Sequence, residues 1–393
     1  MPTQTLRLNG ALCLLNGCLE DCDLFISDGH FAPTSASAAE IDLSEYWLLP
    51  GIVDLHGDGF ERHIRPRPSA PFDKRAALQS ADVELASQGV TTAWFAQSWS
   101  WEGGSRAPDE AVALLEARRQ IAHRLMTDIR IQLRFETHMP GDQAALMAVV
   151  RDYHLDYIVF NNHLPEALEM ANTKPARFAS WAAMNGHVPD DLLAIVRAAH
   201  AADAQIPAFL TALAADLRSA GVMMGSHDDP DPETRAFFRG IGAHICEFPT
   251  SVAAAHAART AGEPVLMGAP NIVRGGSQSG NIAAMELVEE GLCDALISDY
   301  YIPALAQAAW VIADARALSF AHAWEMISTR PAQIMGLSDR GSLTEGRRAD
   351  LVVLNPNTRR VEATVVRGQI AFASGRAAQR LLQAHSPFAL AAQ

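Results

Sequence analysis

Short apolar runs alternate with longer alanine- and leucine-rich segments through the middle of the 393-residue chain. The apolar runs have the length of strands, and the segments between them have the length and periodicity of helices. The runs that we predict as strands are 51–56, 90–96, 129–136, 156–161, 221–226, 243–247, 264–268 and 294–298. Strands that alternate with helices form a parallel sheet, and eight such units predict a (β/α)8 barrel of the TIM type.

The two ends of the chain have a different pattern. Residues 1–50 contain short strand-like runs separated by turns, and strand-like runs return at 351–354 and 361–366. Neither region has helical periodicity. We therefore expect a small β-sandwich domain built from 1–50 and 341–385, and a barrel domain over 51–340.

Side chains that bind metals follow several of the predicted barrel strands. His56 and Asp58 lie two residues apart, so an extended chain points both to one face. The six candidates are His56, Asp58, Glu136, His163, His227 and Asp299. Taken singly, each is more often a capping or paired group, and Glu136 has an alternative partner in Arg134. The repetition at five strand ends favours a shared site, because barrels carry their active sites at that rim.

This set of ligands predicts metal-dependent hydrolysis. Carboxylates and imidazoles suit Zn(II), Mn(II) or Fe(II), and six of them are enough for one ion or for a binuclear centre. Zinc is our first choice. Coordination lowers the pKa of water from 15.7 to about 7, so we expect a metal-bound hydroxide as the nucleophile. Asp299, after the last strand, is expected to accept the proton and pass it to the leaving group.

Charge and hydropathy exclude several classes of partner. The formal net charge of −14 argues against nucleic-acid binding. No run reaches eighteen apolar residues, and the amino terminus has no basic region followed by an apolar one. We therefore expect a cytoplasmic enzyme with a small-molecule substrate and no membrane partner.

The five cysteines are odd in number and lack CxxC spacing. We expect them to be small buried apolar residues of an intracellular protein, rather than a metal site. The cysteines are Cys13, Cys18, Cys22, Cys246 and Cys293.

Several stretches resemble a known group of enzymes. The run 48–56 is similar to the opening strand of the amidohydrolase superfamily, and 341–351 is similar to the start of its closing β-domain. Further stretches resemble the PhnM family, the α-D-ribose 1-methylphosphonate 5-triphosphate diphosphatases of the carbon-phosphorus lyase pathway. These are 61–68, 226–229, 247–250, 265–281 and 297–301. The similarity is weak over 100–220.

The resemblance implies a hydrolase of phosphonate metabolism that releases pyrophosphate from a ribose 5-triphosphate. It implies that the six candidate residues hold the metal, and superfamily membership favours a homo-oligomer. Arginines near the rim, together with backbone amides that glycine residues leave accessible, are predicted to bind phosphate oxygens. We call this predicted set the phosphate cradle. Its members are Arg62, Arg65, Arg67, Arg274, Ser277 and Tyr300. The alternatives are a solvated turn for the first three arginines and a loop salt bridge for Arg274.

Three positions depart from the family pattern and leave the substrate open. Asn162 stands where the family has Asp, Glu166 where it has Gly, and Gln278 where it has His. A carboxylate at 166 and the loss of a histidine at 278 disfavour a triphosphate. The alternative is an amidohydrolase acting on a small amide, an N-acyl amino acid or a cyclic amidine. A catalytically silent scaffold is less favoured, because it has no reason to keep six ligands.

Overall fold

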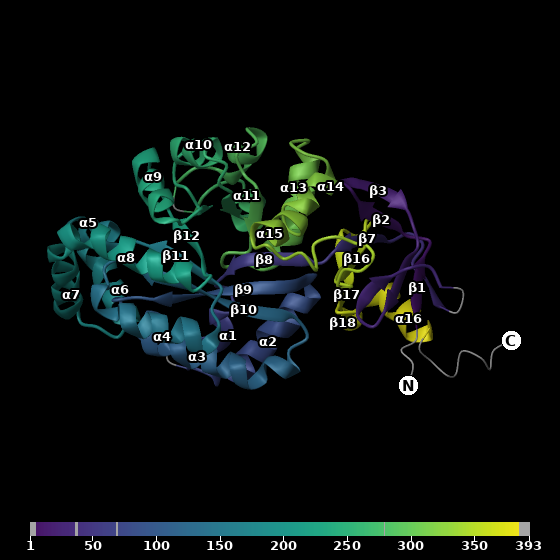
Figure 1. The fold of residues 1–393 in the computed structure, drawn as a ribbon, viewed down its shortest axis with the longest axis horizontal. Helices are drawn as coiled ribbons and strands as arrows, with labels where there is room; N and C mark the ends of the chain where they lie inside the picture. Colours follow the sequence, from purple (N-terminus) through teal and green to yellow (C-terminus); the bar gives the residue numbers. More distant parts are fainter. Residues whose placement is uncertain (1–4, 36–37, 68–69, 279, 385–393) are drawn as a thin grey trace.

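The computed structural model describes residues 5–35, 38–67, 70–278 and 280–384. The first four residues, residues 36–37 and residue 385 of the predicted small domain therefore lie outside the described residues. Figure 1 shows a helix-covered barrel with a smaller β-rich unit beside it, where strands from both ends of the chain lie together.

Eight parallel strands follow one another around the barrel in chain order. They are β8 (Ile52–Gly57), β9 (Val90–Trp99), β10 (Asp128–Glu136), β11 (Tyr157–Asn161), β12 (Met223–His227), β13 (Ile245–Glu247), β14 (Val265–Gly268) and β15 (Ala295–Ile297). A parallel backbone bridge between Gly57 and Asp299 connects the last strand region to the first. The predicted strands are confirmed, and their ends shift by at most three residues.

Helices cover the outside of the barrel (Figure 1). They are α1 (Glu61–Ile64), α2 (Lys74–Ser87), α3 (Pro108–Ile121), α4 (Gln143–Tyr153), α5 (Leu164–Thr173), α6 (Pro175–Met184), α7 (Pro189–Ala201), α8 (Ile206–Ser219), α9 (Pro232–Ile241), α10 (Val252–Thr260), α11 (Ala269–Arg274), α12 (Ala284–Glu289), α13 (Ala304–Asp314), α14 (Phe320–Glu325) and α15 (Thr329–Ile334). In α2, Asp73 caps the first turn by accepting hydrogen bonds from two backbone amides. The buried residues Leu78 and Leu85 then repeat at helical spacing, so one face of α2 packs on the barrel.

The two ends of the chain form two further sheets. Their strands are β1 (Leu6–Asn9), β2 (Leu12–Leu15), β3 (Cys18–Asp21), β4 (Leu24–Ser27), β5 (His30–Ala32), β6 (Ala39–Asp42), β7 (Trp47–Pro50), β16 (Leu351–Asn355), β17 (Arg360–Val366) and β18 (Gln369–Ala373), followed by α16 (Gly375–Ala384). One sheet has the order β5-β4-β1-β6, and the other has the order β18-β17-β16-β7-β2-β3. The antiparallel pairing of β16 with β7 joins the two ends of the chain.

The six-stranded sheet separates two hydrophobic cores. In β16, Leu351 and Val353 pack into the core that the two sheets share. Val352 and Leu354 point the other way and join the core of the barrel. This alternation is the period of two expected of a strand that is buried on both faces. The predicted fold class, a barrel with a β-sandwich from both termini, is confirmed, while the domain limits at 50/51 and 340/341 stay a prediction.

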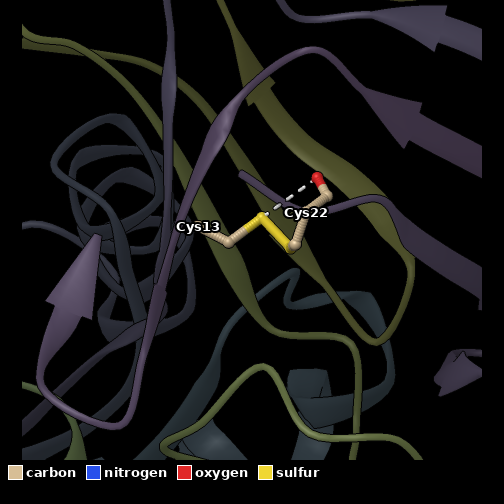
Figure 2. The surroundings of a disulfide bond; sticks show 2 residues. All are labelled: Cys13 and Cys22. Atoms are coloured by element: carbon tan, nitrogen blue, oxygen red, sulfur yellow. Dashed lines mark hydrogen bonds between the residues drawn. A yellow bond between two sulfur atoms is a disulfide. The ribbon is translucent and has the colours of Figure 1, made fainter. Parts of the chain in front are cut away.

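The expectation that the cysteines are small buried apolar residues is wrong for Cys18, which is exposed, and for Cys22, which is half-buried. Cys13 of β2 and Cys22, just after β3, form a disulfide (Figure 2). Their separation of nine residues does not reveal that a β2–β3 hairpin folds them against each other. Cys18 is exposed and free, whereas Cys246 and Cys293 are buried and free.

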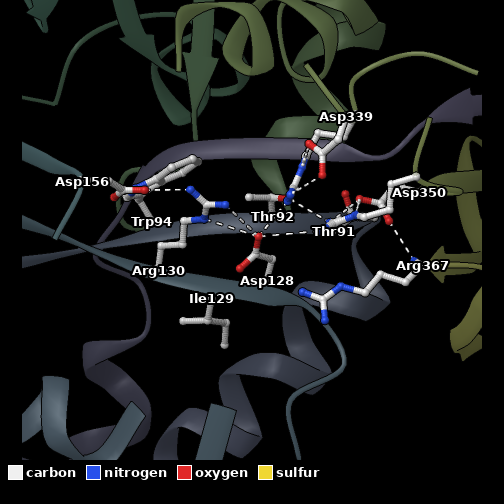
Figure 3. Close-up of polar contacts among 12 residues, drawn as sticks. Thr91, Thr92, Trp94, Asp128, Ile129, Arg130, Asp156, Asp339, Asp350 and Arg367 are labelled. Carbon is white, nitrogen blue, oxygen red and sulfur yellow. Dashed lines mark hydrogen bonds and ion pairs between the residues drawn. The ribbon is translucent and has the colours of Figure 1, made fainter. Parts of the chain in front are cut away.

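An ionic network lies where the barrel meets the second half of the small β unit (Figure 3). Asp128, at the start of β10, accepts hydrogen bonds from Arg130 and from Arg340, whose nearest nitrogen lies at 2.7 Å. Arg348 pairs with Asp350 and lies 3.7 Å from Asp128. These groups sit at the amino ends of the strands, so they contribute to the packing of the two units rather than to the catalytic rim.

Candidate metal centre and substrate cleft

The candidate ligands of β8 and β15 meet where the barrel closes. The amide of Asp299 donates to the carbonyl of His56 at 2.9 Å, and the amide of Asp58 donates to the carbonyl of Asp299 at 2.9 Å. Gly57 is required between them, because an added Cβ would lie 2.6 Å from the hydroxyl of Ser298. The tight closure therefore holds His56, Asp58 and Asp299 at one point of the rim.

A first group of side chains that could hold a metal ion consists of His56, His227 and Glu247. One ligand atom from each lies within 4.8 Å of the others, and the two imidazole rings are 5.3 Å apart between centroids. Nδ1 of His56 lies 2.7 Å from Oε2 of Glu247, in a buried contact. Phe248 packs against both imidazoles, at 5.3 and 4.8 Å between centroids, and so shields this group on one side.

The hydrogen bond that His56 donates to Glu247 sets the tautomer of His56. A carboxylate accepts, so Nδ1 carries the proton, and in the neutral ring Nε2 presents its lone pair. Burial acts to lower the pKa of His56, but the Glu247 carboxylate outweighs it and raises that pKa above the ordinary value. Nε2 is fully buried and has no hydrogen-bond partner among the described residues. A buried nitrogen held in this way beside a second imidazole fits a divalent metal ion.

A second group consists of Glu102, Glu136 and His163. Nδ1 of His163 lies 2.7 Å from Oε1 of Glu136 and 3.1 Å from Oε1 of Glu102. Burial acts to lower the pKa of His163, and the two carboxylates outweigh it and raise the pKa to about 9. Asn161 donates to Glu136 at 2.7 Å. The alternative partner of Glu136, Arg134, lies instead 3.7 Å from Asp58.

A cleft of about 270 Å³ opens at the rim. Its charged lining residues are Asp58, Arg106, Arg134, Asp228 and Asp299, and His227 joins them. Burial is the largest cause that raises the pKa of Asp299 to about 6, with a further contribution from Asp58. At neutral pH, Asp299 is therefore mostly ionised, and it has more affinity for a proton than an ordinary aspartate.

Three rim residues other than glycine have a left-handed backbone. The φ angles are +61° at Asp228, +51° at Phe248 and +54° at Asp299. This conformation costs of order 1 kcal/mol or more for such residues and persists only when the surroundings impose it. It directs side chains that follow β12, β13 and β15 toward the cleft.

The predicted phosphate cradle is divided in the structure. Arg62 pairs with Glu84, Arg65 lies 3.7 Å from Glu110, and neither lines the cleft. Arg67 is exposed and also lies outside the lining.

The remaining three members of the cradle lie at the cleft. Ser277 and Tyr300 line it, and Arg274 donates to the hydroxyl of Tyr300 at 3.1 Å. The substrate-binding role of all six cradle residues stays a prediction.

Of the three residues that depart from the family pattern, one lines the cleft and two do not. Gln278 lines the cleft. Asn162 accepts a hydrogen bond from the backbone amide of Leu164, and Glu166 lies exposed in the first turn of α5. Neither of these two belongs to the cleft lining, so the Glu166 carboxylate does not face the space where a substrate would lie.

Sequence reasoning missed Glu102, Arg134 and Glu247 as members of the site. Glu247 ends β13, which was among the predicted strands, so the rule applied to the other strand ends would have found it. Arg134 was considered only as a partner of Glu136. Glu102 follows β9 in a loop that carries no recognisable motif, and only the tertiary contacts reveal it.

The chain is similar in sequence to known proteins. The model of the amidohydrolase family matches residues 58–372. The chain is 33% identical over 324 residues to an α-D-ribose 1-methylphosphonate 5-triphosphate diphosphatase of Escherichia coli (strain K12), covering 78% of this chain and 82% of that protein.

Solved structures share the fold at low sequence identity. A prolidase in complex with N-methylphosphonate-L-proline is 16% identical with a TM-score of 0.63, covering 94% of this chain and all of that one. N-acetylglucosamine-6-phosphate deacetylase from Pasteurella multocida is 10% identical with a TM-score of 0.61, covering 93% and 99%.

Proposed function

Because the chain belongs to the amidohydrolase family, we propose that it is a metal-dependent diphosphatase that releases pyrophosphate from a ribose 5-triphosphate in phosphonate metabolism. Homology to the E. coli diphosphatase supports this choice of substrate. The observation that carries the metal-dependent chemistry is the buried Nε2 of His56, which has no partner among the described residues and lies beside His227 and Glu247.

We propose that His56, Asp58, Glu136, His163, His227 and Asp299 hold one or two divalent ions, with zinc as the first choice. The donor set fits, because it combines imidazole nitrogens with carboxylates. Glu247 completes the first group of candidate ligands and Glu102 completes the second. A bound ion supplies Lewis acidity and makes water a stronger acid at neutral pH.

The side chains of the rim divide the remaining work. Asp299 is proposed as the group that accepts a proton during attack and returns it to the leaving group, consistent with a pKa of about 6. Arg274, Ser277 and Tyr300 are proposed to bind the substrate from one wall of the cleft.

A second candidate function is hydrolysis of a small amide, an N-acyl amino acid or a cyclic amidine. The observation that favours it is the charge of the cleft. Its described lining holds three carboxylates and only two guanidiniums, and the predicted arginines Arg62 and Arg65 are engaged elsewhere. A triphosphate requires more positive charge than this unless bound ions supply it.

One experiment separates the two candidates. Protein loaded with zinc, manganese or iron is assayed for pyrophosphate release from ribose 5-triphosphates and ATP, and for cleavage of N-acyl amino acids and cyclic amidines. Pyrophosphate release from a ribose 5-triphosphate supports the first candidate. Cleavage of C–N bonds alone supports the second candidate. A metal content below one ion per chain, measured by elemental analysis, would favour a catalytically silent scaffold.

Assembly and location remain proposals. In the described part of the chain, no helix is both long and apolar enough to cross a bilayer. We propose a homo-oligomer in the cytoplasm, although disulfides such as Cys13–Cys22 are more common in oxidising compartments. Light scattering after size exclusion tests the oligomeric state, and fractionation of cells tests the location.

A further inference from the structure

Arg134 is a buried cation that lines the cleft. It lies on β10, two residues before Glu136, so both side chains leave the strand on the same face. The residue is 9% exposed, and it lines the cleft together with Asp58, His227 and Asp299. The small exposed part of Arg134 therefore faces the space where a substrate would bind.

The guanidinium of Arg134 is under-satisfied for a buried arginine. Its Nε is fully buried without a hydrogen-bond partner, and within the described residues its nearest carboxylate, on Asp58, is 3.7 Å away. That distance is too long for a hydrogen bond. The other arginine of the cleft, Arg106, differs, because Glu102 accepts two hydrogen bonds from it at 2.8 and 2.9 Å.

Burial without a close partner has a physical cost. Removing a charge from water costs several kcal/mol unless an opposite charge and hydrogen bonds replace the solvent. Arg130, four residues earlier on β10, shows the usual solution, since Asp156 accepts from it at 2.7 Å and Asp128 accepts at 3.1 Å. Among the described residues Arg134 has no such partner, so the N–H groups that it presents to the cleft remain available to a ligand.

We propose that Arg134 binds an oxyanion of the substrate in the cleft, beside the candidate metal ligands. The planar guanidinium offers parallel N–H groups that match two oxygens of one phosphoryl group. This inference rests on the proposed diphosphatase function. Under that function, the oxyanion is one of the phosphate groups of the substrate's triphosphate. Arg134 is then a substrate-binding residue, and Arg106 serves mainly to hold Glu102.

Binding of inorganic pyrophosphate and phosphate by isothermal titration tests this role without turnover. Wild-type protein, Arg134→Lys and Arg134→Gln are compared at matched metal content, verified by elemental analysis. Loss of a hydrogen bond between charged groups predicts binding about 10- to 100-fold weaker for Arg134→Gln, with a smaller loss for Arg134→Lys. Arg130→Lys is the matched control, because it lies on the same strand away from the cleft, and its affinity should equal that of the wild type.

The outcomes separate this inference from the proposed function. Weaker binding in both Arg134 variants at unchanged metal content supports the inference, even if no ribose 5-triphosphate is hydrolysed. Equal affinity in wild type and Arg134→Gln overturns it, and so does a wild type that binds neither anion. Acetate is titrated in parallel, and binding of acetate without either phosphate anion overturns the phosphoryl assignment in favour of a carboxylate substrate.

Discussion

At the scale of single residues, the hydrogen bond between His56 and Glu247 determines what the site can bind. Glu247 also accepts hydrogen bonds from Gln132 at 2.8 Å and from the buried hydroxyl of Tyr157. These contacts fix its orientation, and its carboxylate in turn fixes the imidazole. The basicity of Nε2 in His56 thus depends on residues that lie outside the cleft lining.

Replacing Glu247 by Gln tests this dependence. The amide is a weaker acceptor and does not require the same tautomer of His56, so the affinity for zinc should fall by about 10- to 100-fold. Competition with a chelator measures the dissociation constant. Glu116→Gln, a half-buried position on α3 that does not line the cleft, is the control and should leave the dissociation constant unaltered. An unchanged affinity in Glu247→Gln would remove this residue from the metal centre.

At the scale of elements, helices α5 to α7 support the second group of the site. Trp181 on α6 donates its indole N–H to Glu102 at 3.0 Å, and His187 lies 3.0 Å from the carbonyl of Glu102. Buried residues of these helices form a hydrophobic cluster of their own, which Trp101 joins from the loop after β9. The cluster therefore positions Glu102 against His163.

Trp181→Phe should reduce kcat/KM by roughly tenfold with little loss of stability, because it keeps the packing and removes one hydrogen bond to a charged group. Trp101→Phe is a matched control, since the indole nitrogen of Trp101 has no partner among the described residues. Steady-state kinetics and thermal unfolding of both variants provide the test. Equal kinetics in the two variants would mean that Trp181 only packs.

The disulfide between Cys13 and Cys22 of the β2–β3 hairpin is expected to stabilise the folded protein. A disulfide that spans nine residues restricts the unfolded chain, and Cys13→Ser should lower the free energy of unfolding by about 2–3 kcal/mol. Urea unfolding under non-reducing conditions measures the change. Cys18→Ser alters the free, exposed cysteine of the same hairpin and should have little effect. Mass spectrometry that finds three free thiols would agree with the pairing, and five would contradict it.

At the scale of the whole molecule, the network around Asp128 links the barrel to the small β unit (Figure 3). Burial acts to raise the pKa of Asp128, but Arg130 and Arg340 outweigh it and hold that pKa far below its usual range. The side chain of Asp128 is 12% exposed and that of Arg340 is 6% exposed, so solvent screens this pair weakly.

Asp128→Asn should destabilise the protein by about 3 kcal/mol near neutral pH, because it leaves buried guanidiniums without their partner. The folded-state pKa of Asp128 is depressed, so its contribution is present above the unfolded-state pKa of about 3.9 and is lost as the pH falls further. The difference between wild type and variant should therefore shrink below pH about 4. Unfolding curves from pH 3 to 7 measure it, and a constant difference across that range would contradict the assignment.

Much of the architecture follows from local pattern. Apolar runs such as Val265–Gly268 and Ala295–Ile297 have few polar positions, because strands of a parallel barrel are covered on both faces. Helices bury only one face and keep a mixed pattern. Since the carboxyl ends of all barrel strands meet at one rim, the sequence by itself was enough to bring His56, His227 and Asp299 to one end of the molecule.

Only the tertiary structure decided which of these side chains touch. His56 and Glu247 are 191 residues apart, and no periodicity encodes their contact. The arginines near 62–67 follow the first ligands in sequence, yet carboxylates on neighbouring helices engage Arg62 and Arg65, because charged side chains on the outside of a barrel pair with whatever lies beside them. Arg134 is the opposite case: only the packing around β10 reveals that this buried guanidinium has no close partner in the described part of the chain.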